Sequence, residues 1–75
     1  MSNIDKLILK MKRQPNGIKF QELAKVLEDN GYMMKPPKGT SHRHFINKQG
    51  DVITIKADNP VKAVYVKDVL RRIGE

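Results

Sequence analysis

Two β-prone segments separated by a short polar turn constrain the fold of this chain more than any other feature. Val52-Ile53-Thr54-Ile55-Lys56 is rich in β-branched residues, and the segment from Ser41 to Asn47 alternates polar and apolar side chains. Between them, Lys48-Gln49-Gly50-Asp51 predicts a four-residue turn. The sequence therefore predicts an antiparallel hairpin, and Tyr32-Met33-Met34-Lys35 predicts a third, short strand.

Three amphipathic segments predict helices around this sheet. Apolar side chains recur at helical spacing over residues 4–13, from Phe20 to the helix-ending pair Asn30-Gly31, and from Val66 to Ile73. The predicted order is α-α-β-β-β-α. We therefore expect an α+β fold in which a three-stranded antiparallel sheet carries helices on one face and leaves the other face open.

Length and composition limit what this domain can contain. A chain of 75 residues has room for one domain and a small core, so a deep cofactor pocket is not expected. The absence of cysteine excludes disulfides and thiolate metal ligands, and is compatible with a reducing compartment. No signal-peptide pattern and no apolar run of about 18 residues is present. The sequence thus predicts a cytoplasmic protein that needs no membrane and no small-molecule cofactor.

The charge balance predicts a polyanionic partner. The chain has 15 Lys+Arg against 8 Asp+Glu, a formal net charge of +7. Residues 31–75 contain nine of the basic and four of the acidic residues. Such an excess indicates nucleic acid or an acidic protein surface as the partner, although a solvated basic surface without a partner is the plain alternative.

Both histidines lie in one short segment, residues 39–45. Because side chains alternate along a strand, Phe45 is expected to face the helices, and His42 and His44 to project from the open face. Lys38 and Arg43 are expected beside them. This arrangement of imidazoles and cations is more typical of a site than of a core.

Four interpretations of this segment remain open. The histidines are surface residues without a role, part of a metal site, part of a passive nucleic-acid surface, or part of a metal-independent ribonuclease. Two same-face histidines are an incomplete ligand set, so no metal ligands are assigned. In a ribonuclease the RNA 2′-hydroxyl is the nucleophile, and the protein supplies a histidine as general acid or base and cations for the phosphate.

The segment resembles a known motif. Gly39-Thr40-Ser41-His42, followed by Phe45, is similar to the glycine-serine-histidine motif of the HicA family, the small messenger-RNA-cleaving toxins of toxin–antitoxin pairs. Three further segments resemble that family: residues 20–32, 49–55 and 60–67. The resemblance covers residues 18–74, so residues 1–17 are interpreted as an N-terminal helical extension of a HicA-like domain at residues 18–75.

The resemblance implies a fold, a catalytic residue and a partner. It implies a double-stranded-RNA-binding-domain-like fold, His42 as the catalytic residue, messenger RNA as the substrate, and a HicB-type acidic antitoxin as the protein partner. Two departures from the family pattern stand in this chain: Thr40 is inserted before Ser41, and Asn47-Lys48 replaces a frequent histidine-proline pair.

Residues around His42 are predicted to bind RNA. The predicted RNA-binding residues are Lys38, Gly39, Thr40, Ser41 and Arg43. Of these, Gly39, Thr40 and Ser41 are expected to donate backbone N–H groups. His44 is an auxiliary candidate because it shares the face, while its position varies within the family. A non-catalytic RNA-binding module and an adaptor for an acidic protein are the alternative functions.

Overall fold

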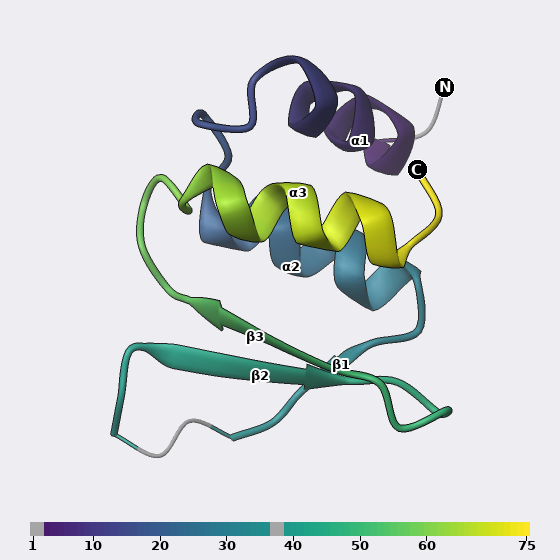
Figure 1. Ribbon diagram of the computed structural model, residues 1–75, viewed down its shortest axis with the longest axis vertical. Helices are drawn as coiled ribbons and strands as arrows, with labels where there is room; N and C mark the ends of the chain where they lie inside the picture. The colour runs from purple at the N-terminus through teal and green to yellow at the C-terminus, as the bar shows by residue number, and fades with distance from the viewer. Residues whose placement is uncertain (1–2, 37–38) are drawn as a thin grey trace.

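A computed structural model describes residues 3–36 and 39–75 and has the predicted α+β architecture. The elements are α1 (Asn3–Arg13), α2 (Phe20–Asp29), β1 (Met33–Met34), β2 (His42–Ile46), β3 (Val52–Lys56) and α3 (Ala63–Arg72). The strands form one antiparallel sheet in the order β1-β2-β3, and all three helices lie on one side of it (Figure 1). The described helices include none that is long and apolar enough to cross a membrane.

The N-terminus of helix α2 is capped by a side chain from a distant loop. Lys19 has a poor side chain for an N-cap, but the Asn59 side-chain oxygen accepts the Phe20 N–H at 2.9 Å. The Glu22 carboxylate accepts the Lys19 N–H at 3.0 Å, and the Lys10 ammonium lies 3.0 Å from the same carboxylate. The Lys19 N–H, followed by Lys10, lowers the pKa of Glu22. These contacts join the start of α2 to α1 and to the loop before α3.

Strand β1 is shorter than predicted and follows directly on the end of α2. Gly31 has φ +88°, and the Tyr32 N–H donates to the Leu27 carbonyl at 3.0 Å, which closes the helix in a Schellman arrangement. Tyr32 therefore belongs to the end of the helix and not to β1. After β1, the Lys35 N–H still donates to the His44 carbonyl at 2.8 Å, and Pro36 follows it.

One hydrophobic core joins all the layers. Figure 1 shows α1 on the far side of α2 and α3 from the sheet. Met11 of α1 is only 1% exposed and belongs to the same cluster as the buried side chains of α2, the hairpin and α3. The other main members of this cluster are Leu23, Val26, Leu27, Phe45, Ile53, Ile55, Val66 and Val69. The N-terminal helix is thus packed on the domain, with Met11 buried and Leu7 and Ile8 partly buried against the core.

The hairpin turn is one residue shorter than predicted. The Asn47 N–H donates to the Asp51 carbonyl at 3.1 Å, so only Lys48, Gln49 and Gly50 form the loop. Gly50 has φ +85°, the left-handed conformation that completes a three-residue hairpin loop. This loop sets the register of the two strands, in which Phe45 lies opposite Ile53. A four-residue turn would shift the pairing by one position.

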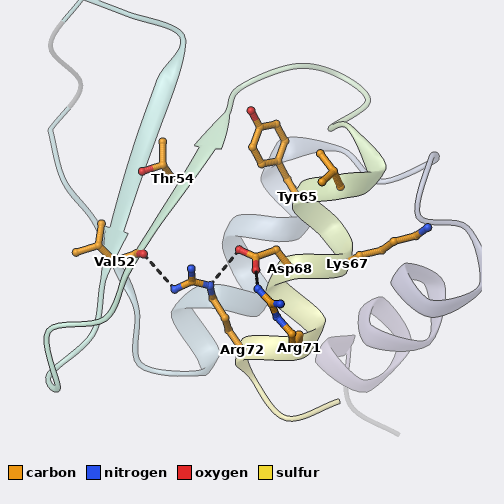
Figure 2. Close-up of a pocket in the computed structure, with 8 residues that line it drawn as sticks. Val52, Thr54, Tyr65, Lys67, Asp68, Arg71 and Arg72 are labelled. Atoms are coloured by element: carbon orange, nitrogen blue, oxygen red, sulfur yellow. Dashed lines mark hydrogen bonds and ion pairs between the residues drawn. The ribbon is translucent and has the colours of Figure 1, made fainter.

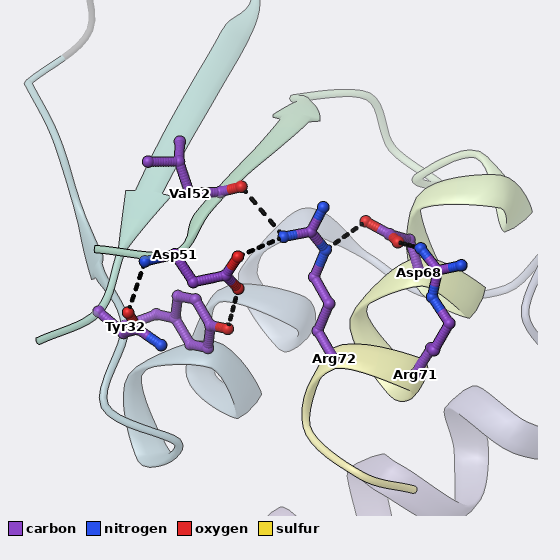
Figure 3. A network of polar contacts seen from close by, with 7 residues as sticks. Tyr32, Asp51, Val52, Asp68, Arg71 and Arg72 are labelled. Atoms are coloured by element: carbon purple, nitrogen blue, oxygen red, sulfur yellow. Dashed lines mark hydrogen bonds and ion pairs between the residues drawn. The ribbon is translucent and has the colours of Figure 1, made fainter. Parts of the chain in front are cut away.

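A polar network holds the hairpin against α3 (Figure 3). The Tyr32 hydroxyl donates to Asp51 Oδ2 at 2.6 Å, and Arg72 Nη1 donates to Asp51 Oδ1 at 2.8 Å and to the Val52 carbonyl at 3.2 Å. Arg72 Nε also donates to Asp68 at 3.0 Å. The hydrogen bond from Tyr32, followed by Arg72, lowers the pKa of Asp51, while the Asp51 carboxylate raises the pKa of Tyr32.

Candidate active site

The open face of the sheet carries both histidines, as predicted. Phe45 is 0% exposed and packs in the core, whereas His42 and His44 are exposed on the opposite face of β2. Alternation along a regular strand accounts for this division. The imidazole groups are therefore accessible to a macromolecular ligand that lies across the sheet.

Thr40 holds the backbone of His42. Its hydroxyl oxygen accepts the His42 N–H at 3.3 Å and lies 3.4 Å from the His42 carbonyl oxygen. The pairing of β1 with Phe45 and Ile46 lies at the other end of β2. The Thr40 hydroxyl therefore helps to fix the backbone of the candidate catalytic residue.

Arg43 supports the same loop from the other face of β2. Its Nη1 donates to the Thr40 carbonyl and, at 3.3 Å, to the His42 carbonyl. Its side chain is half-buried and lies on the helix side of the strand, as its position next to His42 requires. The sequence placed Arg43 beside the histidines. In the structure it lies on the other face of the strand, and its guanidinium closes the loop.

His44 has a defined hydrogen-bond partner. Its Nδ1 lies 2.8 Å from Thr54 Oγ1, the hydroxyl of the residue directly opposite on β3. Because a hydroxyl both donates and accepts, it holds the ring in place for either tautomer. No comparable side-chain contact to the His42 ring occurs within residues 3–36 and 39–75.

Lys56 is the cation that sequence reasoning missed. It lies directly opposite His42 in the β2–β3 pairing, on the same open face. Directly opposed residues have Cβ atoms about 4.5–5.5 Å apart. The Lys56 ammonium is 3.9 Å from Asp58, and its side chain is 38% exposed. A four-residue turn would not pair Lys56 with His42. The sequence therefore did not identify Lys56 as a neighbour of His42.

The remaining predicted site residues divide between described and undescribed parts of the chain. Gly39 adopts φ +76°, and the Ser41 carbonyl accepts the Ala57 N–H at 2.7 Å, which anchors the loop to the end of β3. Both are exposed, as is Thr40. Lys38 lies outside the described residues. The structure thus brings Gly39 to Arg43 together around the backbone of His42.

The chemistry available at this surface is that of an imidazole and an ammonium group. Histidine is the side chain whose ordinary pKa lies closest to neutrality, and it exchanges protons readily at physiological pH. A lysine at cross-strand distance can stabilise negative charge on a phosphate. In the described part of the chain, no three His, Cys, Asp or Glu side chains are grouped closely enough to hold a metal ion.

Comparisons with known proteins produce no match. No family model, no curated protein and no solved structure is significantly similar to this chain.

Proposed function

We propose that this protein is an endoribonuclease that cleaves messenger RNA, and that it is the toxin of a cytoplasmic toxin–antitoxin pair. The observation that supports this proposal is an exposed histidine, His42, beside a lysine on the open face of a basic domain. The order of its elements is compatible with the double-stranded-RNA-binding-domain-like fold that the HicA resemblance implies.

The proposed reaction uses the substrate's own nucleophile and requires no metal. The RNA 2′-oxygen attacks the adjacent phosphorus, an O2′–P bond forms and the P–O5′ bond breaks. His42 takes the proton from the 2′-hydroxyl or supplies one to the leaving 5′-oxygen. Lys56 stabilises the negative charge that develops on the phosphate, with Lys38 and Arg43 as the further predicted phosphate-binding residues.

Paired histidine variants test the assignment. General acid–base catalysis contributes about 10²–10⁴-fold, so we expect His42→Ala to lower the RNA cleavage rate by that factor and to abolish growth inhibition on expression. His44→Ala, an exposed histidine on the same strand, is the matched control and should retain most of the activity. Circular dichroism should show both variants folded. Equal toxicity and equal RNA decay for wild type and His42→Ala would exclude the catalytic role.

The proposed protein partner is an acidic, HicB-type antitoxin. A surface with a net charge of +7 for the chain favours an acidic partner, and a protein that covers the open face would block access to His42. Co-expression with a small acidic protein encoded in the neighbouring reading frame should restore growth. Failure of every such neighbour to restore growth would remove this part of the proposal.

A passive RNA-binding module is the second candidate. It is favoured by one observation, the absence of an orienting side chain on the His42 ring among the described residues, because general bases are usually oriented by a third group. This alternative predicts RNA binding with a steep salt dependence, no cleavage products, and no effect of His42→Ala. An adaptor for an acidic protein would instead bind its partner and show no affinity for RNA.

A further inference from the structure

A groove runs between the outer edge of β3 and helix α3. It has a volume of about 610 Å³, and its walls include Val52 and Thr54 of β3 and Tyr65 and Arg71 of α3. Figure 2 shows the side chain of Arg72 reaching from α3 to the Val52 carbonyl across this space. The groove lies beside the hairpin and does not include His42.

The ladder between β2 and β3 determines which backbone groups point into the groove. The Ala57 N–H donates to Ser41, and the Asn47 N–H donates to Asp51, so the odd-numbered residues of β3 pair with β2. Antiparallel strands alternate hydrogen-bonded and non-hydrogen-bonded pairs. The N–H and C=O groups of the even-numbered residues of β3 therefore point outward, along the free edge.

Four of these outward groups have no partner in the described parts of the chain. The Val52 carbonyl accepts from Arg72, and the Lys56 carbonyl accepts from the Asp58 N–H at 2.9 Å. The N–H groups of Val52, Thr54 and Lys56, and the Thr54 carbonyl, stay free. A row of unpaired backbone groups on an edge strand is a template for another strand.

The side chains around the edge have a definite chemical character. Val52 is 42% exposed and Val64 is 66% exposed, so apolar surface borders the groove on both the strand and the helix. The Arg71 side chain is 79% exposed, and the only carboxylate among the lining residues, Asp68, already pairs with Arg71 and Arg72. The groove is therefore apolar on its rim and positively charged on its helix side.

We propose that this groove binds an extended, acidic segment of a partner protein, which adds a fourth strand to the sheet along β3. Alternation in the added strand would place apolar side chains next to Val52 and acidic side chains next to Arg71 and Arg72. A protein strand fits better than RNA because the free groups are a backbone ladder and the exposed side chains on the rim are valines. The proposal does not depend on the nuclease activity.

A designed peptide provides a direct test. The probe is an acetylated peptide of about eight residues that alternates valine and glutamate, a typical strand length, added to the ¹⁵N-labelled full chain. We expect chemical-shift changes and slowed hydrogen exchange at the amides of Val52, Thr54 and Lys56. The same peptide with lysine in place of glutamate, and one N-methylated at alternate amides, should not bind.

Two pairs of protein variants separate backbone pairing from other effects. Thr54→Pro removes an outward N–H without breaking the ladder to β2, and should weaken peptide binding about tenfold, the loss of one to two hydrogen bonds. Thr54→Val removes the hydroxyl but keeps this N–H, and should bind within about twofold of wild type. Arg71→Glu should weaken binding about fivefold at low salt, whereas Arg13→Glu, an exposed arginine of α1, should not.

Several results would overturn the proposal. The first is the absence of peptide binding at about 1 mM peptide. The second is an unchanged affinity when the peptide is N-methylated or when the protein carries Thr54→Pro. The third is a perturbation of the β3 edge by an oligoribonucleotide but not by the peptide. The last result would assign the groove to RNA. None of these measurements involves RNA cleavage, so failure here leaves the test of His42 unaffected.

Discussion

His42 and His44 share one face of the sheet but have different surroundings. His44 is held by the Thr54 hydroxyl at 2.8 Å, so its ring orientation is defined before any ligand arrives. In His42, by contrast, the contacts are to the backbone: the Thr40 hydroxyl accepts its N–H, and the Arg43 guanidinium donates to its carbonyl. Among the described residues, no side chain makes a comparable contact to the His42 ring, so only its backbone position is defined before a ligand arrives.

Tyr32 and Asp51 provide a prediction about stability and pH. Tyr32→Phe removes the 2.6 Å hydrogen bond to Asp51, so we expect a lower urea midpoint at pH 7. Because the folded-state pKa of Asp51 lies below its ordinary value, this stabilisation is present above about pH 4 and is lost as pH falls through the lowered pKa. The difference between wild type and variant should therefore shrink in acid.

The matched control is Tyr65→Phe. Tyr65 is half-buried on α3, and no hydrogen bond of its hydroxyl occurs within the described ranges. This substitution should change the urea midpoint little, and equally at pH 7 and pH 3. A Tyr32→Phe effect that does not vary with pH would show that the hydroxyl stabilises the fold without Asp51.

Helix α1 is an integral layer of the domain. Its Met11 is buried with α2 and α3, and its Lys10 and Lys12 pair with Glu22 and with Glu75 at the opposite end of the chain. Most of the stability of a short helix comes from tertiary packing of its apolar face. The helix and the segment at residues 18–75 therefore share one core.

This packing predicts the cost of a truncation in α1. Met11→Ala should lower the free energy of unfolding by about 2–5 kcal/mol, the usual cost of removing a buried methionine side chain. Leu9→Ala, at a position 37% exposed on the same helix, should cost only about 1 kcal/mol. Urea unfolding at pH 7 measures both. Equal, small losses would mean that α1 is not part of the cooperative unit.

The two faces of the molecule differ in what they offer to a partner. The helices cover one side of the sheet, and the other side presents His42, His44, Thr54 and Lys56 to solvent. The net charge of +7 attracts RNA at long range, and this attraction does not depend on any single residue. Contact with a particular phosphate, in contrast, depends on individual side chains. The open face should therefore carry the local phosphate contacts.

Salt dependence tests this assignment of faces. Lys56→Gln should weaken RNA binding at every sequence tested and reduce the slope of log K against log salt by about 0.7, the value for one phosphate of a single strand. Lys25→Gln, an exposed lysine of α2 on the helix side, has the same charge change and should leave the slope nearly unaltered. Equal effects of the two substitutions would mean that RNA does not bind on the open face.

Local pattern was sufficient to predict the elements of this fold. The apolar spacing in α2 and the Asn30-Gly31 pair identified that helix, and the β-branched run identified β3 with its observed bounds. One large apolar side chain, Phe45, was enough to assign the faces of β2, because side chains alternate along any strand. These features depend on residues close together in the chain, so they can be predicted from the sequence.

The register of the hairpin and the contacts between distant elements became clear only in the tertiary structure. The left-handed Gly50 shortened the turn to three residues, and this register placed Lys56 opposite His42. Asn59 supplied the cap that Lys19 lacks, and Arg72 joined the hairpin turn to α3. Each contact depends on how strands and helices dock, which is a property of the assembled core. Helical and strand periodicity can thus be recognised in short segments of the sequence. Which residues lie beside His42 depends on the register of the folded sheet.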